Sequence, residues 1–427
     1  MLRLSLFQVT VGMTLVLLAG TLNRVMIVEL GVHASVVSIM LAMPLLFAPF
    51  RTLIGFKSDT HKSALGLKRV PWIWKGTIYQ FGGFAIMPFA LLVLSGFGES
   101  YDAPRWIGIS AAALAFLLVG AGAHIVQTAG LALATDLVKE EDHPKVVGLM
   151  YVMLLVGSVV ASLTYGFLLA NYTPGRLIQV IQGTALVSAT LNMVALWRQE
   201  SFSRERAREM EVAVHPTFRH AFNELMARKG MLPLLSVIAL GTFAYGMADV
   251  LLEPYGGQAL GLTVGETTKL SALFAFGTLT GFGLASRVLG KGMKPMRLGL
   301  VGAILGVPGF AAIIYSSLLP MFLLFVIGTY VVGFGIGLFG HATLTATMRA
   351  APADRVGLAL GAWGAVQATA AGLGVALAGV VRDGLMAMPG VFGDTAAAPY
   401  NMVFTIEAFL LLIAIGFAVP LALSRDK

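Results

Sequence analysis

The chain has 427 residues, of which 57% are hydrophobic and only 12% are charged, and its mean hydropathy is +0.85. Polar residues could not cover so much apolar surface in water, so this composition excludes a water-soluble protein and places most of the chain in lipid. The chain has no cysteine, which excludes disulfides and thiolate sites. Its net charge is +8, and the meaning of this charge depends on where the basic residues lie along the chain.

Twelve apolar stretches are each long enough to cross the roughly 30 Å of bilayer hydrocarbon, which takes about 20 helical residues. They lie near residues 6–29, 34–54, 73–96, 107–134, 147–170, 177–196, 231–252, 267–290, 296–316, 319–347, 356–380 and 401–423. The first stretch has no cleavage site of small residues before Arg24, so we interpret it as a retained helix. The sequence therefore predicts an all-α membrane protein of about twelve transmembrane helices.

The basic residues are distributed unevenly between the connecting segments. If the N-terminus is cytoplasmic, most lysines and arginines fall in inner segments. The predicted outer loops then hold Arg105, Arg176, Lys269 and Arg382. This positive-inside bias orients both termini to the cytoplasm of a bacterial inner membrane. The basic charge therefore reflects topology and gives no reason to expect nucleic acid.

A polar central segment, residues 198–230, divides the chain into two near-equal halves, 1–197 and 231–427. Within this segment Phe218, Phe222, Leu225 and Met226 follow the spacing of an amphipathic helix lying on the membrane surface. A solvated linker is the alternative interpretation.

The two halves resemble each other weakly. The stretch Gly120–Ala129 resembles Gly337–Ala346, and each stretch carries a histidine at its fifth position. Two related six-helix halves joined by a cytoplasmic loop are the plan of the major facilitator superfamily, which binds ligands near the midplane between the halves. The loop after the second stretch supports this fold, because Gly55 and Asp59 match the start of the G-x-x-x-D motif of that superfamily.

The two matching histidines, His124 and His341, are candidate ligands, because polar groups inside a bilayer are costly and often functional. In the superfamily plan both helices line the central cavity, where a neutral imidazole can ligate a magnesium tetrapyrrole. Gln127 and Thr128 lie one turn from the first histidine and Thr345 one turn from the second, which predicts that they orient the rings. The alternative is a pair of buried histidines that only pack between helices.

Charged residues also mark the outer ends of two helices. Asp249 and Glu253 are one turn apart, and we expect Pro254–Gly257 to break their helix directly after them. Arg24 and Glu29 occupy the related end of the first helix. Opposite charges at these ends are predicted to pair across the mouth of a cavity, as a gate or as a structural ion pair.

Glu407 lies inside the last stretch, which has no basic residue of its own. It is either a proton relay or a neutral, hydrogen-bonded carboxyl group. Nucleotide-binding loops, hydrolase and metalloprotease motifs, and the aspartate-rich pair of membrane prenyltransferases are missing from the sequence. We therefore expect a protein that is not an enzyme.

Three segments together carry a family resemblance that runs over nearly the whole chain: Gln127–Asp136, Val147–Gly157 and Asp249–Gly257. They resemble the PucC family, a branch of the major facilitator superfamily from phototrophic bacteria. The resemblance implies assembly of light-harvesting complexes in the cytoplasmic or intracytoplasmic photosynthetic membrane. It also implies bacteriochlorophyll as cofactor, ligated through His124 and His341, with lipid, light-harvesting polypeptides and bacteriochlorophyll synthase as partners. The short tails look most like the short family member encoded among bacteriochlorophyll-synthesis genes.

The sequence is therefore compatible with three functions. The first is a factor that binds bacteriochlorophyll and delivers it to antenna polypeptides. The second is a proton-coupled transporter of a pterin-like or other organic solute, with Asp249, Glu253 or Glu407 carrying the proton. The third, a catalytic subunit of pigment synthesis, is disfavoured by the missing aspartate-rich motif.

Overall fold

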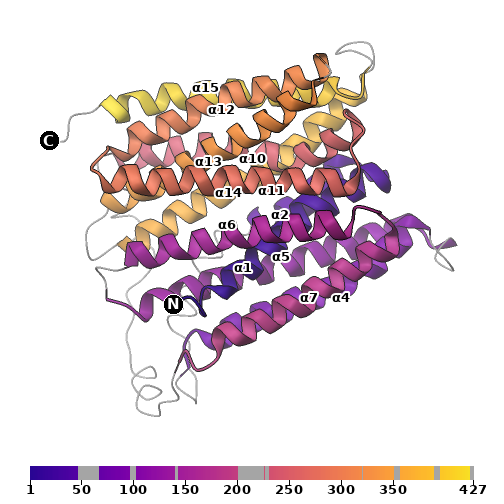
Figure 1. The fold of residues 1–427 in the computed structure, drawn as a ribbon, viewed down its shortest axis with the longest axis horizontal. Helices are drawn as coiled ribbons and strands as arrows, with labels where there is room; N and C mark the ends of the chain where they lie inside the picture. Colours follow the sequence, from indigo (N-terminus) through magenta and orange to yellow (C-terminus); the bar gives the residue numbers. More distant parts are fainter. Residues whose placement is uncertain are drawn as a thin grey trace. The chain divides into compact units, whose positions relative to one another are not determined.

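The computed structural model describes residues 1–46, 67–96, 102–139, 143–200, 226, 230–319, 321–350, 356–388 and 395–423. Across these residues the secondary structure is helical, with no strand. The elements are α1 (Leu6–Leu15), the π-helical segments η1 (Val16–Leu22) and η2 (Val25–Glu29), α2 (Ala34–Leu46), α4 (Val70–Ser95), α5 (Arg105–Asp136), α6 (His143–Leu168), α7 (Pro174–Leu196), α10 (Met231–Gln258), α11 (Val264–Gly290), α12 (Pro295–Leu318), α13 (Phe322–Ala350), α14 (Val356–Met386) and α15 (Ala398–Leu423) (Figure 1).

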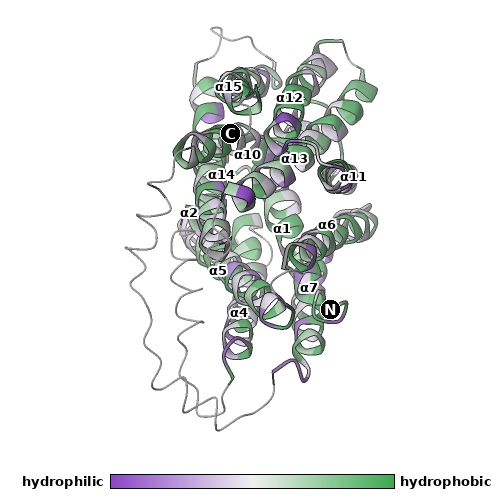
Figure 2. Cartoon of the chain, turned by 90° about the vertical axis from the view of Figure 1, so that its left-hand side faces the viewer, coloured by the Kyte–Doolittle hydropathy of each residue, from purple (hydrophilic) through white to green (hydrophobic). Residues whose placement is uncertain are grey.

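The prediction of an all-α transmembrane protein is confirmed. Within the described ranges, eleven helices are long and apolar enough to cross a membrane, the first being Leu6–Glu29, which combines α1, η1 and η2. The remaining predicted span corresponds to α2, a shorter apolar helix that ends where a stretch of undescribed residues begins. Apolar residues run along most of the length of these helices (Figure 2), as expected when lipid is the solvent.

The chain forms two compact units. Unit 1 comprises residues 1–18 and 47–215, and unit 2 comprises residues 19–46 and 216–427. Residues 19–46 thus pack with the second half, although the predicted boundary places them in the first. The reason is that α2 lies along α14, and the end of the first span contacts α10. The predicted halves 1–197 and 231–427 otherwise stay a prediction, and the predicted surface helix at Pro216–Arg228 lies almost wholly outside the described residues.

Unit 1 packs through small residues. α4 lies along α5 and α7, while α1 contacts α5, α6 and α7 (Figure 1). Gly76 and Gly122 face each other across α4 and α5, and a Cβ atom on either would lie within 2.7 Å of the other's carbonyl oxygen. Such close contact between backbones is how membrane helices gain packing energy without a hydrophobic drive.

Helix α10 is the centre of unit 2, where it contacts α11, α13, α14 and α15. Its apolar segment is 67% buried, against 33% to 50% for the other spanning helices of this unit. Tyr255 of α10 packs edge-on against Phe325, Tyr400 and Phe404, with ring centroids 5.3–5.7 Å apart. The C-terminal part of α10 is therefore held on several sides, and the candidate site is built around it.

Candidate functional site at the end of α10

The segment Leu251–Gly257 lies inside α10, which continues to Gln258. The expectation that Pro254–Gly257 breaks this helix is therefore wrong. Proline has no N–H, so the carbonyl of Val250, four residues earlier, loses its helical partner. The Asn23 side chain replaces that partner, because its Nδ2 donates to the Val250 oxygen at 2.7 Å. A membrane helix tolerates proline when a neighbour satisfies the freed carbonyl in this way.

Glu253 is buried one turn beyond Val250, with 4% of its surface exposed. Ser271 of α11 donates a hydrogen bond to its Oε1 atom, whereas Oε2 has no hydrogen-bond partner within the described part of the chain. Gly20 makes room for the carboxylate, because a Cβ atom there would lie 2.5 Å from Oε1. The first span and α10 therefore meet at a carboxylate with one free acceptor.

Arg24 acts electrostatically on this carboxylate and is only 2% exposed. Its guanidinium forms an ion pair with Glu29 and donates to the carbonyl of Leu262 at 2.8 Å. Gly257 leaves space for it, since a Cβ atom there would lie 3.1 Å from Nη2. Arg24, Glu29 and Glu253 lie near one another, but the direct ion pair is within the first span. The predicted gate across the mouth of a cavity, which included Asp249, stays a prediction. The first span is π-helical on both sides of Arg24. π-helices are rare in proteins, and those that occur are often at functional sites.

A second buried arginine was not predicted as part of a site. Arg382 was expected in an outer loop, but it lies in α14 and is 5% exposed. It pairs with Asp383 at 2.7 Å, donates to the side chain of Gln258, and lies 4.8 Å from the ring centre of Tyr400. Asp383 in turn accepts a hydrogen bond from the backbone N–H of Ser35 at 2.7 Å. The sequence signal that could have predicted this site is the adjacent pair Arg382 and Asp383 beside an apolar stretch.

This arginine cluster joins four elements of unit 2: α2, α10, α14 and α15. Arg176 and Lys269, also expected in outer loops, lie instead near the starts of α7 and α11. These helices therefore begin before the apolar stretches do, because long basic side chains near the start of a membrane helix can extend to water.

Asp249 and Glu407 are neighbours on α10 and α15. Asp249 is exposed although Ala248 and Val250 on either side of it are fully buried. Glu407 is fully buried, both of its carboxyl oxygens lack a hydrogen-bond partner among the residues described, and Asp249 acts on it electrostatically. A buried carboxyl group without a partner is costly, which marks Glu407 as a functional candidate.

His341 lies in α13 with its ring centre 4.1 Å from that of Phe282. Its Nδ1 atom is buried and has no hydrogen-bond partner in the described structure. Thr345 does not orient this ring through its hydroxyl, which donates instead to the His341 backbone carbonyl at 2.9 Å. A free acceptor nitrogen inside a membrane helix fits the residue type expected of a magnesium ligand.

His124 and its neighbours Gln127 and Thr128 lie in α5 of unit 1, where Gln127 is buried and the other two are partly buried. His341 belongs to unit 2, so a cavity shared by the two histidines stays a prediction. No group of three or more metal-binding side chains occurs among the described residues.

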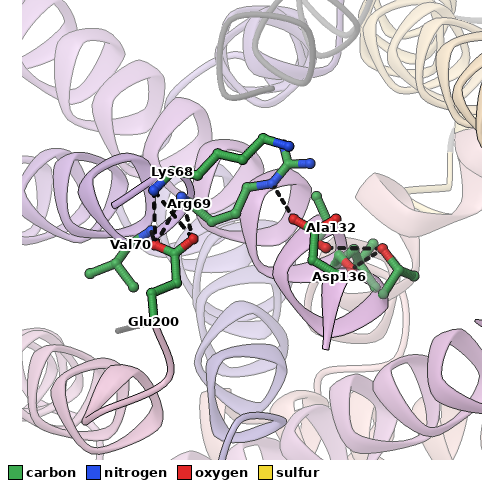
Figure 3. Close-up of polar contacts among 8 residues, drawn as sticks. Lys68, Arg69, Val70, Ala132, Asp136 and Glu200 are labelled. Carbon is green, nitrogen blue, oxygen red and sulfur yellow. Dashed lines mark hydrogen bonds and ion pairs between the residues drawn. The ribbon is translucent and has the colours of Figure 1, made fainter. Parts of the chain in front are cut away.

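A further polar cluster connects α4, α5 and α7 in unit 1 (Figure 3). Glu200, just after α7, accepts hydrogen bonds from the backbone N–H groups of Lys68, Arg69 and Val70 at 3.0–3.3 Å. Arg69 also pairs with Asp136 at 2.9 Å. A carboxylate at a helix N-terminus is stabilised by the free N–H groups and the helix dipole. The loop-motif residues Gly55 and Asp59 precede this cluster and lie outside the described residues.

The fold is that of the major facilitator superfamily. One solved structure of this fold is a bacterial homologue of the human lysosomal transporter Spinster, in an inward-facing and unoccupied conformation. It superimposes with a TM-score of 0.69 at 16% sequence identity, covering 99% of this chain and 96% of that one. At this identity the likeness concerns the fold alone.

Sequence relatives define the family within that fold. The family model described as PUCC protein matches residues 21–425. Protein PucC of Rhodobacter capsulatus is 78% identical over 423 residues, which cover 99% of this chain and 92% of the relative. The chain therefore belongs to the PucC family, as the sequence resemblance indicated.

The placement beside the short family member is not supported. The relative named Bacteriochlorophyll synthase 44.5 kDa chain, also from Rhodobacter capsulatus, is only 28% identical, covering 99% of this chain and 95% of the relative. The chain is far more similar to the protein named PucC. Short tails misled that placement because tail length says little about the transmembrane core, where the matched residues lie.

Proposed function

We propose that the chain is a non-enzymatic factor for the assembly of light-harvesting complexes, which binds bacteriochlorophyll and delivers it to antenna polypeptides. Family membership carries this proposal, because the similarity to Protein PucC extends over 99% of the chain. The name of the more distant relative, a bacteriochlorophyll synthase chain, supports pigment as the compound that this family handles. Lipid, light-harvesting polypeptides and bacteriochlorophyll synthase are the proposed partners, in the photosynthetic membrane.

His341 is the residue that fits the pigment best. Its Nδ1 atom lacks a hydrogen-bond partner among the described residues, and its ring is only partly buried. Bacteriochlorophyll, when bound, would supply a magnesium ion, and the neutral imidazole of His341 would be its ligand. Phe282, against the His341 ring, provides an aromatic surface beside the same position. His124 is the proposed second ligand in unit 1.

The test is the absorption spectrum of the protein purified in mild detergent from its own phototrophic membranes. We expect bound bacteriochlorophyll in the natural protein and loss of most of it in His341→Leu. The control is His33→Leu, which makes the same change at an exposed histidine between η2 and α2 and should keep the pigment. In parallel, deletion of the gene should lower the antenna absorption of whole cells, and the natural protein should restore it.

The two measurements separate the parts of the proposal. Antenna absorption that is unaffected by the deletion would contradict a role in assembly. Absence of pigment from the natural protein, with an assembly defect in the deletion strain, would leave assembly and remove pigment binding. Pigment that persists in His341→Leu would move the site elsewhere.

A proton-coupled transporter of an organic solute is the second candidate. It is supported by the unpartnered carboxyl group of Glu407 beside the exposed Asp249, and by the transporter fold. Solute uptake into vesicles that follows an imposed proton gradient and is lost in Asp249→Asn would favour this function over pigment delivery.

A further inference from the structure

Three elements of unit 2 bring buried side-chain oxygen atoms together: the second part of the first span, α10 and α11. These oxygens belong to Thr21, Asn23, Glu253, Thr268 and Ser271, which we call the oxygen cluster. Thr21, Asn23 and Thr268 are fully buried, and Glu253 is nearly so. The hydroxyl oxygens of Thr21 and Thr268 lie 3.4 Å apart, and Ser271 donates to the Glu253 carboxylate. The first span therefore meets both α10 and α11 at polar atoms.

Two oxygen atoms of the cluster lack a donor. Glu253 Oε2 and Asn23 Oδ1 are buried and have no hydrogen-bond partner within the described ranges. The Asn23 amide cannot turn over to offer a donor there, because its Nδ2 already donates to the Val250 carbonyl at 2.7 Å. Val250 and Glu253 are three positions apart, so both free oxygens belong to side chains at the same turn of α10. Buried acceptors without a donor are costly, and two of them at one turn indicate a positively charged ligand.

The charges around the cluster leave one negative charge uncompensated. Arg24 forms an ion pair with Glu29 and donates to the Leu262 carbonyl, so its guanidinium is already engaged. The pair of Arg24 and Glu29 is neutral, which leaves the charge of the Glu253 carboxylate. A buried charge is expensive without a partner. One monovalent cation would neutralise it, whereas a divalent cation would leave an excess of positive charge.

We propose that the oxygen cluster binds one monovalent metal cation, with Glu253 Oε2 and Asn23 Oδ1 as ligands. Carboxylate and amide oxygens are donors that hard cations prefer. The hydroxyl oxygens of Thr21 and Thr268 have lone pairs that can complete the set of ligands. The first span alternates between π- and α-helical winding here, and membrane transporters bind sodium with oxygen atoms beside interrupted helices. The bound ion joins the first span to α10 and α11, whether or not the chain handles pigment.

Thermal unfolding of the purified protein in mild detergent tests this site. Sodium chloride, potassium chloride and choline chloride are compared at equal ionic strength, because choline is a bulky organic cation that cannot replace a metal ion. We expect sodium or potassium to raise the unfolding temperature by several degrees over choline, since a ligand that binds only the folded state stabilises it. Glu253→Gln should abolish this shift. The control, Glu407→Gln, removes another buried carboxyl group of unit 2 and should keep it.

A second variant keeps the test decisive if Glu253→Gln does not fold. Thr268→Val preserves the shape of the side chain and removes one hydroxyl oxygen from the cluster. It should raise the cation concentration that gives half of the shift on the order of tenfold. An unchanged concentration in Thr268→Val would contradict the proposed ligands.

Three other results would overturn the proposal. The first is an equal unfolding temperature in all three salts; a dependence on pH alone would then mean that Glu253 takes up a proton instead. The second is a shift that persists in Glu253→Gln, which would place the ion elsewhere. The third is loss of the shift in Glu407→Gln as well, which would indicate a general effect of removing buried charge.

Discussion

Asn23 shows how a single side chain allows α10 to continue as a helix through Pro254. Pro254 removes one hydrogen-bond donor from α10, and the Asn23 amide supplies another to the Val250 carbonyl. Gly20 and Gly257 then leave room for Glu253 and Arg24, respectively. Glu253, Pro254 and Gly257 are thus explained by residues of the first span, more than 200 positions away in the sequence.

We predict that Asn23→Ala lowers the free energy of unfolding by about 1–3 kcal/mol, because it leaves a buried carbonyl unpaired. Pro254→Ala restores an N–H at position 254, which can bond to the Val250 carbonyl within the helix. The double variant should therefore regain most of the loss. A double-mutant cycle measured by detergent-induced unfolding checks this. Additive losses in the two substitutions would contradict the proposed exchange of donors.

At the scale of elements, glycines determine how closely two neighbouring helices can pack. Gly277 and Gly281 of α11 have the same four-residue spacing as Gly333 and Gly337 of α13, and each would place a Cβ atom against the backbone of the other helix. This arrangement lets α11 and α13 approach closely, as small residues do in membrane helix pairs. It also explains why so many of the 50 glycines lie inside helices.

Gly281→Ala and Gly283→Ala form a matched pair on α11. A Cβ atom at Gly281 would clash with the Phe334 carbonyl, whereas one at Gly283 has nothing within 4 Å. We expect Gly281→Ala to cost about 1–3 kcal/mol through overpacking, and Gly283→Ala to be neutral or stabilising by up to about 1 kcal/mol. Thermal unfolding in detergent measures both. Equal effects of the two substitutions would mean that this face of α11 is not closely packed.

At the scale of the whole molecule, the chain is two compact units whose boundary does not follow the sequence midpoint. The first span belongs to unit 1 up to Leu18 and to unit 2 from Ala19 onward. Its second part carries Asn23, Arg24 and Glu29 to α10. One continuous span therefore contributes to both units, a division that no composition shift in the sequence marks.

The orientation of the whole chain is set by its basic residues, since lysine and arginine are retained on the cytoplasmic side during insertion. We predict that alkaline phosphatase fused to the C-terminus is inactive and that a fluorescent protein fused there is bright. A control fusion truncated after Leu262, between α10 and α11, should give the opposite pattern. An active phosphatase at the full-length C-terminus would contradict the assigned topology.

The sequence by itself determined the solvent, the helical class, the approximate spans and the family. The solvent, the helical class and the spans follow from summed hydropathy along the chain, because each residue contributes its own free energy of transfer into lipid. The family follows from three short sequence segments. It also indicated Arg24, Glu29, Asp249 and Glu253 as a gate or ion pair; the structure pairs Arg24 with Glu29, and the gate stays a prediction. Histidine ligation of pigment and the loop motif at Gly55 and Asp59 stay predictions.

Only the tertiary structure decided that α10 continues through Pro254, that Arg382 is buried against Tyr400, and that residues 19–46 pack with the second unit. Each of these outcomes depends on a partner far away in the sequence: Asn23 for the proline, Gln258 for the arginine, and α14 for α2. Local patterns report the cost of placing a proline or a charge in a membrane helix. The distant residue that offsets this cost becomes visible only in the folded chain.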